Sequence, residues 1–192
     1  MPMTKASLLL AFLLLCAASC SSSEAASDSD MLTVGSLFTS EAPPQEVDIR
    51  NYTILSTQVA GGGSITPEQV ASLPGKGYTT IISLRFEREN GVVAEMAAAD
   101  AAGLTYVSIP VGGGDFTLEH AMKVSEAIQA SSGHVLFHCA SGGRVSAVWA
   151  LTRAIDEGLT PSEAGRVAAE EGCRPIPESM VNRVMAELQA AR

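Results

Sequence analysis

The sequence has few basic residues, few aromatic residues and few histidines. Twelve Lys and Arg stand against 21 Asp and Glu, which makes the formal net charge −9, and aromatic residues form 5% of the chain. No basic run interleaved with aromatic residues occurs, so the composition argues against nucleic acid as a partner. The three His and four Cys do not cluster at the spacing of metal ligands, so we expect neither a metal nor another cofactor.

Apolar runs long enough to cross a membrane are also lacking. The apolar stretch at residues 7–18 is short, follows Lys5 and precedes small residues, which is typical of a signal peptide over residues 1–19. The residues around Cys20 resemble a bacterial lipoprotein box, which implies that Cys20 is lipidated. Export as a soluble protein, after cleavage near Ala25, is the alternative. We expect a protein of the periplasm or outer envelope, attached to a membrane through an N-terminal lipid only.

The rest of the chain divides into a tether and one domain. Residues 20–50 are rich in Ser, Asp, Glu and Pro, and this composition predicts a flexible tether. Residues 51–192 have the length of one domain with a hydrophobic core. This domain holds two cysteines, Cys139 and Cys173. In an exported chain they either form a disulfide or remain free thiols, and both alternatives stay open.

Strand-like segments alternate with helical segments along the domain. Thr66 and Thr160 each begin a capped helix, because Pro follows directly and Gln or Glu stands at the third position. Four segments have the length and apolar composition of strands: residues 52–59, 78–84, 104–111 and 134–138. The alternation predicts an α/β fold, with a parallel sheet of four to five strands flanked by helices on both faces.

The most informative passage is residues 134–144, in which a buried strand runs into Cys139, two glycines and Arg144. The residues that follow, 145–155, have the apolar spacing of a helix. A cysteine between a strand end and a helix start points at free backbone N–H groups, which stabilise a thiolate and bind anions. Arg144 adds a planar fork of donors that fits phosphate or sulfate oxygens. The passage predicts a nucleophilic cysteine acting on an anionic substrate.

Each of these residues also has an ordinary interpretation. A lone buried Cys at a strand end is more often a small apolar side chain, paired glycines form turns, and an arginine in a first helical turn is commonly solvated. The combination of strand, Cys139, glycines, Arg144 and apolar helix favours the functional interpretation. The topology supports it, because Cys139, Arg85 and the loop 112–115 would all lie at the carboxyl edge of the sheet.

Three blocks resemble the cysteine-dependent phosphatase superfamily, in particular its compact dual-specificity-like branch: Thr79–Arg85, Tyr106–Val111 and His138–Arg144. The resemblance covers residues 58–151 and is greatest for the phosphatase-like domain of bacterial beta-lactamase-hydrolase-like proteins. It implies a dual-specificity-phosphatase-like fold and hydrolysis of a phosphoester. The substrate would be a phosphorylated small molecule or protein.

The last block departs from most of that superfamily. Tyrosine and dual-specificity phosphatases place five residues between the cysteine and the arginine, whereas Cys139 and Arg144 enclose four. The beta-lactamase-hydrolase-like branch and rhodanese-type sulfurtransferases resemble the shorter loop. Phosphatase relatives also usually carry Ser or Thr directly after the arginine, where this chain has Val145, followed by Ser146. Sulfur transfer to or from a sulfur-bearing substrate is therefore an alternative, as is a non-catalytic anion-binding module.

The resemblance implies a role for each residue of the site. Cys139 would be the nucleophile that forms a thiophosphate, and Arg144 would hold the equatorial oxygens. Asp115, in a glycine-rich loop before Cys139, is the best candidate for the general acid. His138 would order the loop rather than transfer a proton. The anion-binding loop would comprise His138, Ala140, Ser141, Gly142, Gly143 and Arg144.

Overall fold

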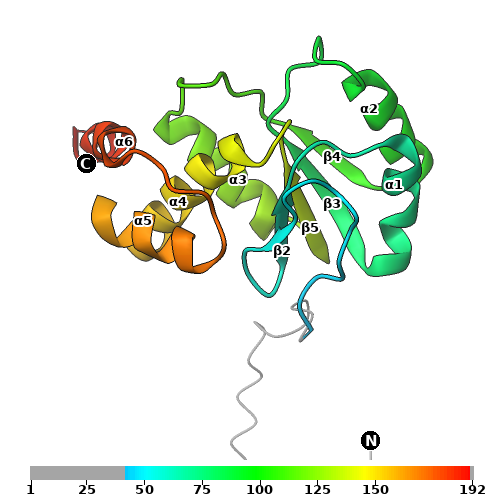
Figure 1. Ribbon diagram of the computed structural model, residues 1–192, viewed down its shortest axis with the longest axis horizontal. Helices are drawn as coiled ribbons and strands as arrows, with labels where there is room; N and C mark the ends of the chain where they lie inside the picture. The colour runs from blue at the N-terminus through cyan, green and yellow to red at the C-terminus, as the bar shows by residue number, and fades with distance from the viewer. Residues whose placement is uncertain (1–41, 191–192) are drawn as a thin grey trace, which may run out of the picture. The chain divides into compact units, whose positions relative to one another are not determined.

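The computed structural model describes residues 42–190, and its strands form one five-stranded sheet in the order β1-β2-β5-β3-β4 (Figure 1). The strands are β1 Thr53–Ile54, β2 Val59–Gly62, β3 Tyr78–Ser83, β4 Thr105–Ser108 and β5 His134–His138. The helices are α1 Pro67–Ser72, α2 Val92–Ala101, α3 Leu118–Gln129, α4 Gly143–Glu157, α5 Pro161–Glu170 and α6 Glu178–Ala190, with a 3-10 turn at Pro74–Lys76. The predicted α/β fold is confirmed.

The sheet is parallel except at one edge. β2, β5, β3 and β4 run in the same direction, whereas β1 is antiparallel to β2. The prediction of a single strand over residues 52–59 is wrong, because a turn interrupts it. The hydroxyl of Ser56 accepts the N–H groups of Gln58 (3.2 Å) and Val59 (3.0 Å). A connection this short joins only antiparallel strands, so β1 and β2 form a hairpin.

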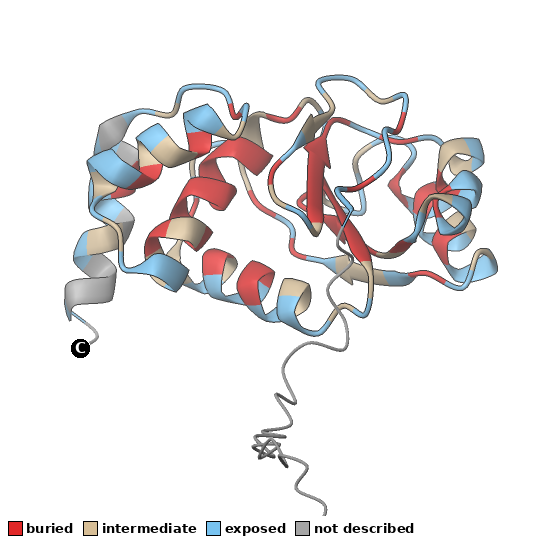
Figure 2. Cartoon of the chain, turned by 90° about the horizontal axis from the view of Figure 1, so that it is seen from below, coloured by how far each residue is buried: buried red, intermediate tan, exposed pale blue. Residues whose placement is uncertain are grey.

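Helices cover both faces of the sheet, as predicted. On one face α1 and α2 pack with a cluster that includes Ile81 and Leu136. On the other face α3, α4, α5 and α6 enclose a second cluster, which includes Phe137 and Trp149. Leu136 and Phe137 are neighbours in β5, so the central strand is buried on both sides. Figure 2 shows the buried residues on the strands and on the helix sides turned toward them.

The packed domain begins earlier than the predicted boundary at residue 51. Val47 is 2% exposed and belongs to the same core cluster as α1 and α2. The hydroxyl of Tyr78 donates a hydrogen bond to the carbonyl of Gln45 (2.8 Å). Burial of Val47 removes apolar surface from water, so this part of the predicted tether is held in the fold.

The other predictions for the N-terminal segment lie outside the described residues. These are the signal peptide over residues 1–19, lipidation of Cys20 and the tether as far as residue 41. Within residues 42–190, no helix combines the length and the apolar character that a membrane crossing requires.

Threonine caps fix where three helices begin. Thr66, Thr117 and Thr160 each accept the backbone N–H of the third residue on, and that residue's side chain binds the threonine N–H in return. The capping boxes predicted at Thr66 and Thr160 are confirmed. At Thr117 the returning group is His120, whose Nδ1 accepts the N–H of Thr117 at 3.2 Å. α3 therefore starts at a defined position directly after the glycine-rich loop 112–115.

Candidate active site

The loop after β5 is anchored to the neighbouring backbone at the carboxyl edge of the sheet. The N–H of Cys139 donates to the carbonyl of Gly62 (3.2 Å), and the N–H of Ser64 donates to the carbonyl of Ala140 (3.3 Å). Nδ2 of Asn51 donates to the carbonyl of Ser141 (2.9 Å). These bonds hold the carbonyl side of the loop against β2 and its flanks. The N–H groups of the first turn of α4, which begins at Gly143, have no carbonyl partner within the helix and can bind a ligand.

The sulfur of Cys139 lies at the start of α4, as predicted. Gly142 is the N-cap of α4 and has a left-handed backbone with φ of 85°. Its N–H donates to Sγ of Cys139 at 3.1 Å, which turns the loop around the sulfur. Cys139 itself is only 1% exposed. The sulfur thus lies beside both an N–H donor and the N-terminus of a helix.

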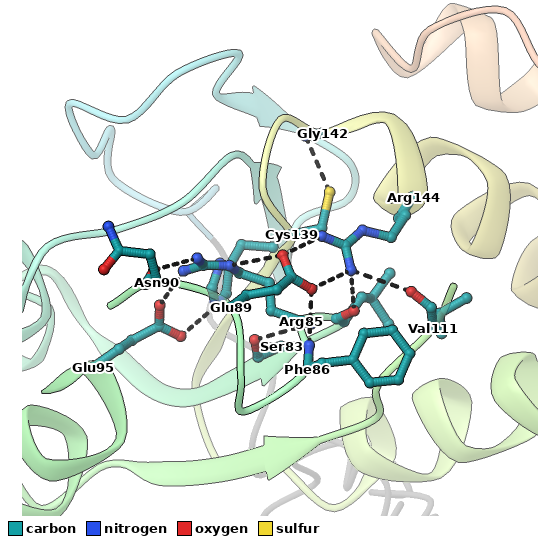
Figure 3. A network of polar contacts seen from close by, with 12 residues as sticks. Ser83, Arg85, Phe86, Glu89, Asn90, Glu95, Val111, Cys139, Gly142 and Arg144 are labelled. Atoms are coloured by element: carbon teal, nitrogen blue, oxygen red, sulfur yellow. Dashed lines mark hydrogen bonds and ion pairs between the residues drawn. The ribbon is translucent and has the colours of Figure 1, made fainter. Parts of the chain in front are cut away.

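Arg144 is held from one side by Glu89 and by two carbonyls (Figure 3). Nη1 donates to Glu89 Oε1 (2.8 Å), to the Leu84 carbonyl (2.8 Å) and to the Val111 carbonyl (3.1 Å), and Nη2 donates to Glu89 Oε2 (2.8 Å). The remaining edge, formed by Nε–H and the second N–H of Nη2, lies on the side of the Cys139 sulfur in Figure 3. The hydrogen bond to Glu89 is the largest cause that raises the pKa of Arg144. Burial lowers this pKa, and the nearby Cys139 sulfur raises it further.

Glu89 is a site residue that the sequence analysis missed. The N–H of Phe86 donates to Oε1 of Glu89 (2.9 Å), and Nε of Arg85 lies 3.5 Å from Oε2. The bond from Arg144 is the main cause that lowers the pKa of Glu89 to about 2. The carboxylate therefore stays charged and fixes the guanidinium of Arg144 at neutral pH. The sequence holds one signal for it, the four-residue spacing from Arg85.

His138 is placed beneath the loop rather than on its anion-facing side. Side chains alternate along β5, so His138 faces α2 while Cys139 faces the cluster of α3 to α6. His138 is fully buried, and its Nε2 lies 2.8 Å from Oε1 of Glu95. Arg85, for which the sequence suggested only a place near the site, is also buried. Its Nη1 lies 3.3 Å from Oε2 of Glu95.

Asp115 lies on the exposed loop between β4 and α3. Its carboxylate folds back over Gly112, since a Cβ built at Gly112 would lie 2.7 Å from Oδ2 of Asp115. Arg183 of α6 donates to the carbonyls of Gly114 (2.9 Å) and Phe116 (3.2 Å), which ties the loop to the helix layer. Within the described residues Asp115 makes no ion pair, so its carboxylate is available to solvent and to a ligand.

The second cysteine of the domain lies behind the loop. Cys139 and Cys173 are both free thiols in the structure. Ser146 donates to the carbonyl of Gly142 (3.2 Å) and accepts the N–H of Arg174 (2.9 Å), so it joins the loop to the chain around Cys173. Burial raises the pKa of Cys173 to about 11. A cavity of about 280 Å³, which the sequence analysis did not predict, is lined by residues of both segments, among them Gly142 and Cys173.

The structure therefore brings the sulfur of Cys139, the start of α4 and the guanidinium of Arg144 together at one edge of the sheet. Sulfur, helix N-terminus and the free edge of Arg144 converge on one position, and an acidic loop lies on the same sheet edge. Within residues 42–190, no group of three or more His, Cys, Asp or Glu is arranged to hold a metal ion.

Solved structures with this fold include proteins described as phosphatases. A DUF442 protein from Shewanella putrefaciens CN-32 is 21% identical with a TM-score of 0.58, over 73% of this chain and 94% of that chain. TpbA from P. aeruginosa, in complex with pTyr, is 20% identical with a TM-score of 0.51, over 77% of this chain and 98% of that chain. At these identities the similarity shows a common fold.

Sequence comparison identifies the family. The Beta-lactamase hydrolase-like protein of Xylella fastidiosa is 32% identical over 122 residues, which cover 62% of this chain and 28% of that protein. The chain thus matches less than a third of the length of that relative. The family model described as "Beta-lactamase hydrolase-like protein, phosphatase-like domain" matches residues 48–156, more than half of the chain. The chain therefore belongs to the family of phosphatase-like domains found in beta-lactamase hydrolase-like proteins.

Proposed function

We propose that the chain hydrolyses a phosphoester through a covalent intermediate on Cys139. The observation that carries the proposal is the geometry of Arg144. Glu89 occupies one edge of its guanidinium, and the other edge faces the sulfur. A phosphoryl group bound at that edge would receive two N–H donors, and the free N–H groups at the start of α4 would bind its other oxygens.

The proposed reaction has two steps. The thiolate of Cys139 attacks phosphorus, the bond from phosphorus to the leaving oxygen breaks, and Asp115 gives that oxygen its proton. Water then attacks the thiophosphate, Asp115 takes a proton from the water, and the bond from sulfur to phosphorus breaks. The products are an alcohol or phenol, inorganic phosphate and the regenerated thiolate. The exposed position of Asp115 beside Gly112 supports its role, because the leaving group must depart toward solvent.

A phosphorylated compound is the proposed class of substrate. TpbA, which shares the fold, forms a complex with pTyr, and this supports a phosphomonoester with an aromatic leaving group as a first substrate to test. A chain of net charge −9 does not attract anions over long range, so affinity must come from Arg144 and the loop N–H groups.

Release of phosphate from p-nitrophenyl phosphate tests the proposal. We expect turnover that orthovanadate inhibits and that Cys139→Ser abolishes. Cys173→Ser is the matched control, because it removes the other buried thiol and should leave turnover unchanged. Phosphate release that persists in Cys139→Ser, or a wild-type protein that releases none from any phosphomonoester tested, would show that the proposal is wrong.

Sulfur transfer is a second candidate, and the four-residue loop favours it. One residue fewer between Cys139 and Arg144 means one backbone N–H fewer around the bound group, which suits a persulfide sulfur better than a tetrahedral phosphate. Thiocyanate formation from thiosulfate and cyanide, lost in Cys139→Ser, would favour this candidate. If neither assay responds and the protein still binds vanadate, a non-catalytic anion-binding module is the remaining candidate.

We also propose that the chain is exported and anchored by a lipid on Cys20. The support is the sequence of residues 1–20 alone. In a bacterial host, metabolic labelling with a fatty-acid analogue should label the full chain and leave Cys20→Ala unlabelled. An unlabelled wild-type chain in the soluble periplasmic fraction would instead identify the protein as soluble after export.

A further inference from the structure

A chain of ionisable side chains, each in contact with the next, joins the two ends of the catalytic loop, and Figure 3 shows its part from Arg144 to Glu95. It runs from Arg144 to Glu89 (2.8 Å), from Glu89 to Arg85 (3.5 Å), from Arg85 to Glu95 (3.3 Å) and from Glu95 to His138 (2.8 Å). His138 directly precedes Cys139, and Arg144 closes the loop after it. Arg85 is the middle member of the chain and contacts both Glu89 and Glu95.

The inner half of this chain is buried. The side chains of Glu95 and His138 are 0% exposed, and that of Arg85 is 7% exposed. Burial alone would raise the pKa of Glu95, but its contacts with His138, Tyr106 and Arg85 outweigh burial and hold the pKa below its usual value. A charged carboxylate at this depth requires its partners, so removal of one partner costs far more than the same change at the surface.

Arg85 also changes how strongly the negative charge of Glu89 acts on the guanidinium of Arg144. Glu89 is shared by two guanidiniums, those of Arg85 and Arg144. Without Arg85 the carboxylate would be balanced by Arg144 alone, and less of the positive charge of Arg144 would act on a bound anion. Arg85 also donates to the carbonyl of Asn90 (2.6 Å), which fixes the loop that carries Glu89.

We propose that Arg85 is a positioning residue. It holds the carboxylates of Glu89 and Glu95 in place, so that Arg144 presents its free edge to the anion. The inference rests on the proposed function for its catalytic consequence, although anion binding by the loop can be measured without turnover. Arg85 touches no substrate atom. It acts through Glu89 on the rim of the site and through Glu95 and His138 on its base.

The test compares Arg85→Lys with Arg153→Lys in the full chain. Lysine keeps the charge but cannot span two carboxylates as a guanidinium does. Arg153 is the matched control, because it also bridges two carboxylates, Glu157 (2.6 Å) and Glu171 (3.2 Å), further along α4. We expect Arg85→Lys to weaken orthovanadate binding, measured by calorimetry, about tenfold and to lower kcat by a similar factor. Arg153→Lys should change neither.

Glu89→Gln provides a second route if Arg85→Lys does not fold. The side chain of Glu89 is 25% exposed, so this substitution should disturb the fold less than a change at the buried Arg85. It removes the charge through which Arg85 acts on Arg144. Glutamine offers Arg144 one acceptor oxygen in place of the two of Glu89, and we expect this loss of position to outweigh the charge that the substitution leaves unopposed, so vanadate binding should weaken. Where Arg85→Lys folds, the double variant should bind vanadate about as weakly as Glu89→Gln, because both changes interrupt the same connection. Unchanged vanadate binding in Glu89→Gln would contradict the inference.

The outcomes separate this inference from the proposed function. If Arg85→Lys lowers only the melting temperature, with wild-type vanadate affinity and kcat, Arg85 is structural and the inference is wrong, whereas phosphoester hydrolysis stands. If the wild type binds vanadate but hydrolyses no phosphoester, the proposed function fails. The weaker vanadate binding of Arg85→Lys would then still support the positioning role.

Discussion

Two regions of the domain hold a buried cysteine, and they surround it differently. At the start of α4, Cys139 accepts the N–H of Gly142 and lies beside the guanidinium of Arg144. Between α5 and α6, Cys173 is 9% exposed, and burial raises the pKa of its thiol despite a contact with Ser146. Burial therefore disfavours a thiolate at Cys173, whereas the groups that surround Cys139 include a backbone N–H donor and a guanidinium.

The largest expected difference between the two regions is in turnover. Cys139→Ser should abolish hydrolysis of p-nitrophenyl phosphate, because a serine hydroxyl is a far weaker nucleophile, whereas Cys173→Ser should keep wild-type kcat and KM. Steady-state kinetics of both purified variants measure this. Equal losses in the two variants would show that the cysteines serve a common structural purpose.

The next largest effect is expected at Arg144, the guanidinium that lies beside Cys139. Arg144→Lys should lower kcat/KM by about 10²-fold, since lysine presents no two-pronged edge to the equatorial oxygens and cannot keep the paired bonds to Glu89. Unfolding in urea should show that the variant remains folded. An Arg144→Lys variant as active as the wild type would mean that the anion is held by the loop N–H groups alone.

A smaller effect is expected from the left-handed turn that brings an N–H to the sulfur. Gly142→Ala should lower the free energy of unfolding by about 1–2 kcal/mol, because φ of 85° is unfavourable for alanine. A Cβ there would have 3.6 Å to its nearest neighbour, so strain rather than a clash is the cause. Gly165→Ala, in open space within α5, should instead stabilise by roughly 0.5–1 kcal/mol. Urea denaturation of both variants measures the contrast.

The smallest effect is a pH dependence at the second cysteine. The folded-state pKa of Cys173 is raised to about 11 from an ordinary value of 9.0, so the neutral thiol is favoured in the folded state. Its contribution to stability is present below pH 9 and is lost as the pH rises toward 11. Iodoacetamide labelling of Cys173, followed by peptide mass spectrometry, should stay slow at about pH 8 and accelerate only above about pH 9. Fast labelling at neutral pH would contradict the assignment.

The sequence predicts those parts of the site that are local. Cys139, Gly142 and Arg144 follow one another along a strand, a loop and a helix, so their relative placement is set by backbone geometry that the pattern already indicates. The fold class follows in the same way from alternating strands and helices. The hairpin at Ser56 escaped prediction because one hydroxyl, and no glycine or proline, makes the turn.

The connection of these side chains to the loop could not be predicted, because Arg85, Glu89 and Glu95 are distant in sequence from His138 and Arg144. Glu89 stands 55 residues before Arg144, and its neighbour Glu87 offers the same side chain. Glu95 lies in the first turn of α2, where an acidic residue is ordinarily explained by the helix dipole. Only the pairing of β3 with β5 brings α2 over His138 and shows that Glu95 is fully buried.

The most direct test of the account is to trap the covalent intermediate on Cys139. Rapid acid quenching during turnover of an aryl phosphate, followed by peptide mass spectrometry, should find one phosphoryl group on the peptide that contains Cys139. Asp115→Ala should increase its steady-state amount if hydrolysis of the thiophosphate becomes the slower step. Turnover with no modified Cys139 at any quench time, or a phosphoryl group on another residue, would contradict the central claim.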